Sequence, residues 1–197
     1  MQLIAVTNRR LCANRQDFLR HIQILSETLR PGDAILLREK DLSLPQYRVL
    51  AEECDAICKH GSPRLILHSF PEAAPPLGLR EIHLPMPQLK RNKPDDLRCS
   101  TSVHSVEEAV LAEQLGAAFV IAGHIFPTDC KKGLQPRGLP FLQSVCEAVS
   151  LPVFAIGGIT PQVVPSVMEA GAAGICVMSG LMTCDDLPGA ITKLKQQ

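Results

Sequence analysis

Two stretches of the chain, LGAAFVIAG at residues 115–123 and AGAAGICVM at residues 170–178, repeat one pattern. Each reads as the end of a helix, then a glycine turn, then a short apolar run. That order is typical of a crossover helix leading into a buried parallel strand, because glycine lets the helix stop and such a strand is apolar on both faces. The repeat therefore predicts an α/β fold made of successive strand and helix units.

Six further apolar runs of strand length extend this pattern over the whole chain. The eight predicted strands cover residues 3–8, 34–39, 64–69, 81–85, 99–104, 119–125, 152–158 and 174–180. Dividing 197 residues among eight units leaves about 25 residues for each, which is short for a barrel but feasible with short loops. We therefore predict an α/β fold of the TIM (β/α)8 barrel class, as a single compact domain over residues 1–197. An open doubly wound sheet is the alternative.

Helix signals lie between the predicted strands. Ser105 and Glu108 form a capping-box pattern, in which each side chain bonds the amide of the other residue. Thr160 followed by Pro161 predicts an N-cap and a first-turn proline for a later helix. The segment FPEAAPPLGLR at 70–80 is rich in proline, so we expect the third crossover to be irregular.

Composition limits the kinds of partner. The chain has 20 Lys and Arg against 20 Asp and Glu, a formal net charge of zero, and no basic run that would form a nucleic-acid-binding face. The N-terminal residues lack the pattern of a secretory signal, and no apolar run approaches the length of a membrane span. We expect a cytoplasmic protein with reduced cysteines, no nucleic-acid or membrane partner, and a small-molecule ligand. The oligomeric state is left open, with a homodimer among the options.

In a TIM barrel the chemistry lies at the carboxyl ends of the strands. After the seventh predicted strand come Gly157 and Gly158, and after the eighth come Met178 and Ser179. Glycine-rich loops at this place let backbone amides approach a phosphate closely. We predict a phosphate site formed by these four residues; the alternative is that the glycines only make tight turns.

Three polar residues are expected at the opening of the barrel, which we call its mouth. Two cations lie across the mouth from the glycine loops, and a histidine lies near its centre. Arg38 and Lys40 alternate along the second strand, so both side chains can face one second anion; solvated rim charges are the alternative. Glu39 between them is expected to be a structural ion-pair partner. His124 lies in an otherwise apolar strand, and an imidazole there can exchange a proton near neutral pH. A hydrogen-bonded core histidine is the alternative for His124.

The loop after the sixth strand is dense in polar residues. Thr128 and Lys131 can donate hydrogen bonds and one positive charge to a ligand. Asp129 invites a magnesium interpretation, but no second carboxylate stands at a strand end, so we expect no metal. Cys130 as a nucleophile is a weaker alternative.

The remaining histidines are less informative. His104 shares a face with Ser102 and is read as structural. His68 and His83 stay undecided between a structural and a functional role.

Five motifs together resemble the thiamine phosphate synthase and TenI superfamily over nearly the whole chain. They are LLREKDLS (36–43), SVHSVEEA (102–109), GHIFPTDCKKG (123–133), FAIGGITP (154–161) and AGAAGICVMSG (170–180). The resemblance implies a small TIM barrel that acts in thiamine biosynthesis.

Departures from the synthase pattern favour the TenI branch. Thiamine phosphate synthases use Mg²⁺ and carry an Asn-Asp pair after strand three and another Asp after strand four. This chain has His68-Ser69 and Pro87-Gln88 at those places. Its motif GHIFPTDCKKG looks instead like that of the thiazole tautomerases, in which a histidine replaces the proline of typical synthases.

The resemblance to thiazole tautomerases implies a substrate, a reaction and residue roles. The enzyme aromatises a carboxylated dihydrothiazole bearing an ethyl phosphate to the thiazole carboxylate phosphate by an acid/base proton shift, without metal or cofactor. His124 is the implied base and Lys40 the implied acid. Other implied contacts are Arg38, Ser102, Thr128 and Lys131 for the substrate, and Gly157, Gly158, Met178 and Ser179 for its phosphate. Thiamine phosphate synthase activity and a catalytically silent, ligand-binding regulator are the alternatives.

Overall fold

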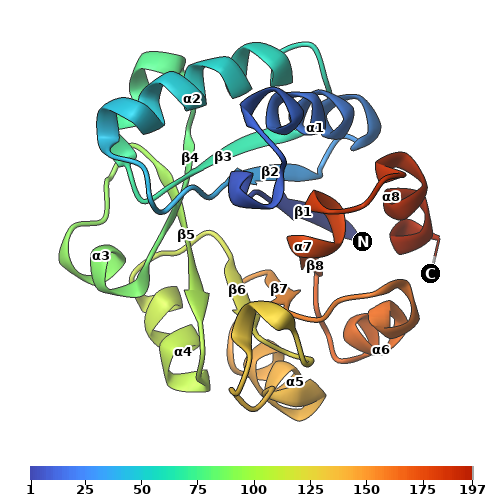
Figure 1. Ribbon diagram of the computed structural model, residues 1–197. Helices are drawn as coiled ribbons and strands as arrows, with labels where there is room; N and C mark the ends of the chain where they lie inside the picture. The colour runs from blue at the N-terminus through green and yellow to red at the C-terminus, as the bar shows by residue number, and fades with distance from the viewer. Residues whose placement is uncertain (197) are drawn as a thin grey trace.

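A computed structural model describes residues 1–196 and shows a closed barrel of eight parallel strands surrounded by helices (Figure 1). Each strand pairs with the next, and the last pairs with the first. The strands are β1 (Gln2–Val6), β2 (Ala34–Leu37), β3 (Arg64–His68), β4 (Glu81–Leu84), β5 (Arg98–Val103), β6 (Val120–Gly123), β7 (Val153–Ile156) and β8 (Gly174–Val177). The predicted fold class is confirmed, and the alternative of an open sheet is wrong.

Helices follow most strands and cover the outside of the barrel (Figure 1). The α-helices are α1 (Arg15–Thr28), α2 (Leu44–Cys58), α3 (Met86–Arg91), α4 (Val106–Gln114), α5 (Gly138–Ala148), α6 (Val164–Glu169), α7 (Ser179–Met182) and α8 (Leu187–Lys195). Short 3₁₀ helices are η1 (Arg9–Leu11), η2 (Pro71–Ala73), η3 (Pro75–Leu77), η4 (Asp129–Lys131) and η5 (Pro161–Val163). The third crossover contains only η2 and η3, as its prolines predict. Within residues 1–196 no helix has the length and apolar character that crossing a membrane requires.

Two predicted helix starts differ in detail from the structure. The Ser105 hydroxyl accepts from the Glu108 amide at 3.2 Å, but the Glu108 carboxylate accepts from the His104 amide at 2.6 Å instead of the Ser105 amide. The box is thus displaced by one residue, because the backbone turns at the end of β5. Thr160 precedes η5, and its side chain makes no capping hydrogen bond. Helix α6 begins three residues further along, after this 3₁₀ turn.

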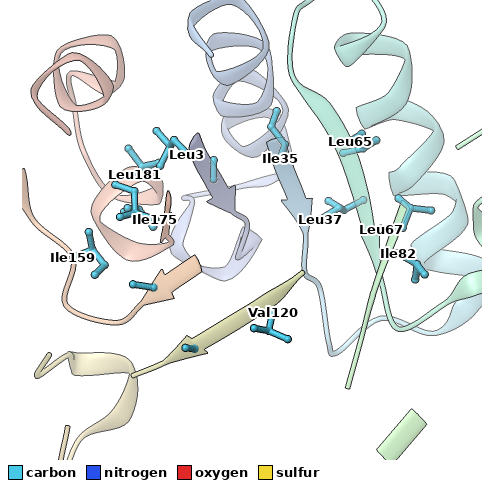
Figure 2. Close-up of a cluster of buried hydrophobic side chains, with 14 of the residues drawn as sticks. Leu3, Ile35, Leu37, Leu65, Leu67, Ile82, Val120, Ile159, Ile175 and Leu181 are labelled. Carbon is cyan, nitrogen blue, oxygen red and sulfur yellow. The ribbon is translucent and has the colours of Figure 1, made fainter. Parts of the chain in front are cut away.

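Side chains of the strands alternate between two apolar layers. Those pointing outward, such as Leu3, Ile35 and Leu67, pack against the helices in one large cluster, part of which Figure 2 shows. Those pointing inward form a separate cluster that fills the barrel. Its buried members are Ile4, Val6, Ala34, Leu36, Ile66, Phe119, Ile121, Phe154 and Cys176. The barrel interior is therefore a packed core and leaves only its mouth for a ligand.

A buried ion pair joins the C-terminal helix to the opposite end of the barrel from the mouth. The Asp33 carboxylate accepts hydrogen bonds from the Lys195 ammonium at 2.6 and 2.7 Å. It also accepts from the amides of Leu3 and Arg30, each at 2.9 Å. Because Asp33 is 1% exposed, the pair links α8 to the start of β1 and β2 through a buried carboxylate and a partly buried ammonium.

Candidate active site

The inner face of the barrel changes from apolar to polar at the carboxyl ends of the strands. Arg38 follows the buried Leu36 by two residues, and His68 follows Ile66 by two. Because strand side chains alternate, these polar groups continue the inward-facing rows above the apolar interior. They define a polar mouth where the loops after the strands converge, as expected for a TIM barrel.

The loop after β2 is anchored by a buried carboxylate. The strand ends at Leu37, so Arg38, Glu39 and Lys40 lie in the following loop and not in the strand as predicted. Glu39 is 2% exposed; its carboxylate accepts from the Thr7 hydroxyl at 2.6 Å and from the Arg9 amide at 3.0 and 3.1 Å. Burial raises the pKa of the Glu39 carboxyl, which these hydrogen bonds partly offset. The structural role expected for Glu39 is confirmed, and this role fixes its two cationic neighbours.

Three cations gather on this side of the mouth. Burial lowers the pKa of Arg38. Partial burial, together with the positive charges of Arg38 and Lys131, lowers the pKa of Lys40. Lys131, in the loop after β6, is therefore close enough to Lys40 for their charges to interact. None of these three side chains forms an ion pair with any carboxylate in the described part of the chain. Positive charge without ion-pair contacts at this place favours an anionic ligand.

The glycine loop after β7 packs directly against the loop after β6. Gly157 has φ +99°, and a Cβ there would lie 2.4 Å from the Cβ of His124. Gly158 has φ +66°, and a Cβ there would lie 2.4 Å from the Pro127 carbonyl oxygen. The Phe126 amide donates to the Gly157 carbonyl at 3.0 Å. Only glycine fits this close approach, and it brings His124 beside the predicted phosphate loop.

His124 lies between two loops. It is half-buried, and its Nε2 lies 3.4 Å from the Leu134 carbonyl oxygen, which is at the outer limit of a hydrogen bond. The imidazole is thus held only weakly and remains accessible to a ligand. Such an arrangement suits a group that exchanges protons with a ligand better than one buried in a core network.

The backbone amides in the loops after β7 and β8 are available to bind an anion. In the structure described for residues 1–196, no hydrogen bond uses the amide of Gly157 or Gly158. Ser179 opens α7, and the first amides of a helix have no partner within it. Met178 precedes this turn and packs against the inner cluster. These positions can form the predicted phosphate cradle.

The loop after β6 forms a hollow of its own. Its lining residues are Pro127, Thr128, Asp129, Lys131, Lys132, Gly133 and Leu134, around a volume of about 360 Å³. Thr128 leads into η4, and its carbonyl accepts from the Lys131 amide at 3.0 Å. The structure brings Lys131 near Lys40, whereas it shows no hydrogen bond between Thr128 and either His124 or Lys40.

His104 has the structural role that the sequence suggests. It is exposed at the end of β5, and its Nδ1 lies 2.7 Å from the Gly123 carbonyl oxygen. The ring N–H can donate to this carbonyl, which belongs to the residue before His124. His104 thereby supports the loop that carries His124.

Two buried histidines, undecided from the sequence, form a polar floor under the mouth. His83 is 3% exposed, with its Nδ1 2.9 Å from the Ser100 hydroxyl and its Nε2 2.9 Å from the Ser102 hydroxyl. The His68 ring stacks on it with 5.7 Å between ring centroids. The Nδ1 of His68 lies 2.7 Å from the Ser69 hydroxyl. The sequence signal that points to such a pair is a polar residue at the inward-facing positions of two adjacent strands.

Both histidines are held neutral. Burial, the neighbouring His83 ring and the charges of Arg38 and Lys40 lower the pKa of His68 to about 2. Burial and the same two cations lower the pKa of His83 to about 3. At neutral pH each ring therefore offers one donor and one acceptor.

The mouth does not fit the magnesium site that the synthase resemblance implies. The Asp129 side chain is 94% exposed and pairs with Lys132 at 3.5 Å. The Glu39 carboxylate is buried and already accepts hydrogen bonds from Thr7 and Arg9. Across residues 1–196 no three His, Cys, Asp or Glu side chains are grouped so that they could hold a metal. Because Mg²⁺ prefers carboxylate and other oxygen ligands, a cation-rich mouth of this kind does not suit it.

Fold and mouth together define a TIM-barrel protein whose cation-rich mouth, at the carboxyl ends of the strands, suits a small anionic ligand. Sequence comparison is more specific: residues 3–181 match the TMP-TENI family, described as thiamine monophosphate synthase. The chain belongs to this family.

Individual relatives agree with this assignment. The chain is 33% identical over 180 residues to the thiamine-phosphate synthase of Methanospirillum hungatei, covering 88% of this chain and 87% of that protein. It is 30% identical over 201 residues to the thiamine-phosphate synthase of Pyrococcus abyssi, covering 100% and 94%. The solved structure of thiamine phosphate pyrophosphorylase from Pyrococcus furiosus superposes with a TM-score of 0.83 at 26% identity, covering 99% of this chain and 94% of that one.

These relatives confirm the superfamily that the motifs indicate and its link to thiamine biosynthesis. They are enzymes by name, and their names are those of synthases. The tautomerase branch is therefore a finer statement, which depends on the residues of the mouth.

Proposed function

We propose that the chain is a thiazole tautomerase of the TenI branch. Its substrate is a carboxylated dihydrothiazole with an ethyl phosphate, and its product is the aromatic thiazole carboxylate phosphate. The observation that carries this proposal is the close packing of His124 against the glycine loop at Gly157, in a mouth rich in cations where residues 1–196 supply no carboxylate set for magnesium.

Two anions on the substrate match two regions of the mouth. The phosphate is bound by the amides at Gly157, Gly158 and Ser179, where a ligand oxygen replaces the missing hydrogen-bond acceptors. The ring carboxylate is bound by Arg38, with Lys131 and Ser102 nearby. Binding at both ends orients the ring between them.

The ring held in this way lies within reach of an acid and a base. His124 removes the proton from the ring carbon that bears the carboxylate, which breaks one C–H bond. Lys40 donates a proton to the other end of the conjugated system and forms the new bond. Its lowered pKa makes Lys40 a better acid than an ordinary lysine. The product has the same composition as the substrate, and both side chains recover their protonation states by exchange with water.

Thiamine phosphate synthase activity is the second candidate, and the names of the relatives favour it. That reaction joins a pyrimidine diphosphate to a thiazole phosphate and uses Mg²⁺ to neutralise the leaving diphosphate. The poor fit of the mouth to magnesium argues against it in this chain.

A direct assay separates the candidates. Purified protein is incubated with the dihydrothiazole precursor in buffered D₂O and followed by proton NMR, and in parallel with both synthase substrates and Mg²⁺. We expect aromatisation with deuterium incorporation and no thiamine phosphate. Formation of thiamine phosphate would instead establish the synthase. Binding of the thiazole phosphate with neither reaction would indicate a silent regulator.

The role of His124 has its own test. His124→Gln is expected to lower turnover by about 10² to 10⁴-fold while leaving product binding largely intact, because it removes proton transfer but not the anion contacts. His60→Gln, at an exposed histidine outside the mouth, is the matched control. Unchanged turnover in His124→Gln would remove this residue from the mechanism.

A further inference from the structure

The ring of His83 is held between two serine hydroxyls of one neighbouring strand. Ser100 and Ser102 lie on the inner face of β5, each 2.9 Å from one ring nitrogen of His83. Ser100 is 1% exposed, whereas Ser102 is half-buried at the edge of the mouth. The ring thus connects a closed hydroxyl to one that a ligand can reach.

Two proton arrangements satisfy both 2.9 Å contacts of a neutral His83 ring. In the first, Nδ1–H donates to Ser100, the Ser100 hydroxyl donates to the Ile82 carbonyl at 3.4 Å, and the Ser102 hydroxyl donates to Nε2. In the second, the Ser100 hydroxyl donates to Nδ1 and Nε2–H donates to the Ser102 oxygen, which frees the Ser102 O–H to donate to a ligand. An anionic acceptor beside Ser102 selects the second arrangement.

Neighbouring groups pack against the His83 ring and restrict its movement. The His68 ring stacks on one face at an interplanar angle of 22°. His68 is in turn fixed, because its amide donates to the Tyr47 hydroxyl at 2.8 Å and that hydroxyl donates to the Leu37 carbonyl at 2.7 Å. Tyr47 is 1% exposed, so the support is rigid.

We propose that His83 is a positioning residue, which holds the Ser102 hydroxyl as a hydrogen-bond donor to the ring carboxylate of the ligand. Leu37 pairs with Leu67, so Arg38 follows β2 beside His68. His68 pairs with His83, and the Ser102 hydroxyl lies 2.9 Å from the His83 ring. Ser102 therefore lies at the same part of the mouth as the cations. A carboxylate only accepts hydrogen bonds, which matches a free O–H and not a free oxygen lone pair. The inference rests on the ligand class of the proposed function. It assigns recognition of the carboxylate, separately from recognition of the phosphate, to a neutral hydroxyl beside the cations.

Binding of two ligands tests this role without any catalytic step. The probes are the aromatic thiazole carboxylate phosphate and the same thiazole phosphate without the carboxylate, measured by calorimetry. His83→Leu removes both hydrogen bonds, Ser102→Ala removes the hydroxyl itself, and His83→Gln restores a donor toward Ser102. Thr101→Val is the matched control, because Thr101 lies between the two serines on the same strand and its buried hydroxyl has no partner in the described structure.

We expect His83→Leu and Ser102→Ala to bind the carboxylated ligand about 10- to 100-fold more weakly, as for loss of a hydrogen bond to a charged group. Binding of the ligand without the carboxylate should stay the same. His83→Gln should recover most of the lost affinity, and Thr101→Val should behave as the wild type. Should His83→Leu fail to fold, the comparison of Ser102→Ala with His83→Gln carries the test.

The possible failures are distinct. An equal loss for both ligands, or no loss for either, would overturn the positioning role of His83. The wild type could bind the carboxylated ligand more tightly than the other ligand, lose this preference in His83→Leu, and yet show no tautomerase turnover. That result would refute the proposed function and support this inference. A wild type that binds neither ligand would overturn both, because the ligand class would be wrong.

Discussion

Acid should destabilise this protein through the two buried histidines of the mouth, His68 and His83. In the unfolded chain each imidazole takes up a proton near its ordinary pKa of 6.5, whereas in the folded protein burial lowers the pKa to about 2 for His68 and about 3 for His83. Between these values the unfolded state binds more protons than the folded state. The free energy of unfolding must therefore fall as the pH falls below 6.5, and the loss continues until the folded pKa is reached.

The size of the effect follows from the two pKa values. One pKa unit corresponds to about 1.4 kcal/mol, so a histidine that stays neutral on folding costs about 2 kcal/mol of stability between about pH 7.5 and about pH 5. The two histidines together account for about 4 kcal/mol over this interval. That is a large share of the stability of an ordinary domain.

The measurement is urea unfolding of four proteins at the two pH values. The wild type is compared with His68→Gln, His83→Gln and the exposed-site control His60→Gln. Each buried variant should lose about 2 kcal/mol less than the wild type on acidification, since glutamine does not titrate. His60→Gln should retain the wild-type dependence. If both buried variants show the wild-type difference between the two pH values, the reasoning on burial is refuted.

Two more predictions concern packing at opposite ends of the barrel. Gly157→Ala should lower turnover more than ten-fold and lower the free energy of unfolding by about 1–3 kcal/mol, because its Cβ would lie 2.4 Å from that of His124 at a φ of +99°. Gly78→Ala, at φ +71° with no atom within 4 Å of the added Cβ, should lower the free energy of unfolding less and leave turnover unchanged. Lys195→Met should lower the unfolding free energy by about 3 kcal/mol without affecting turnover, because it leaves the buried Asp33 carboxylate without its cation. Turnover assays and urea unfolding test both predictions. Equal behaviour of the two glycine variants would contradict the first, and a loss of unfolding free energy below about 0.5 kcal/mol in Lys195→Met would contradict the second.

The fold could be predicted from the sequence because strand, turn and helix signals agree along nearly the whole chain. Apolar runs such as 119–125 are too short for helices and are bounded by glycine or proline, which leaves parallel strands. The ends of the strands are harder to predict from the sequence. The run 34–39 looks like one strand, yet β2 stops at Leu37, because the buried Glu39 carboxylate draws the chain into hydrogen bonds with Thr7 and Arg9. A side-chain anchor of this kind, some 30 residues away in sequence, leaves no local pattern.

The site could be predicted less completely. Loops after strands seven and eight are recognisable by their glycines, and His124 by its apolar surroundings. The roles of His68 and His83 were not accessible, because they depend on the register between β3, β4 and β5. His83 lies opposite Ser100 and beside His68 in the sheet. An irregular crossover separates β3 from β4, so no periodicity in the sequence determines which residues become neighbours.

The barrel interior is divided into an apolar core and a polar rim at the mouth, and this division has an evolutionary consequence. Side chains such as Phe119, Ile121 and Phe154 fill the barrel below the mouth, and of the proposed ligand-binding residues Met178 packs against this cluster. Polar rim side chains that do not contact this cluster can therefore be exchanged a few at a time at little risk to folding. A lineage with this architecture can thus change its reaction through successive substitutions at the mouth while the core below keeps the barrel folded.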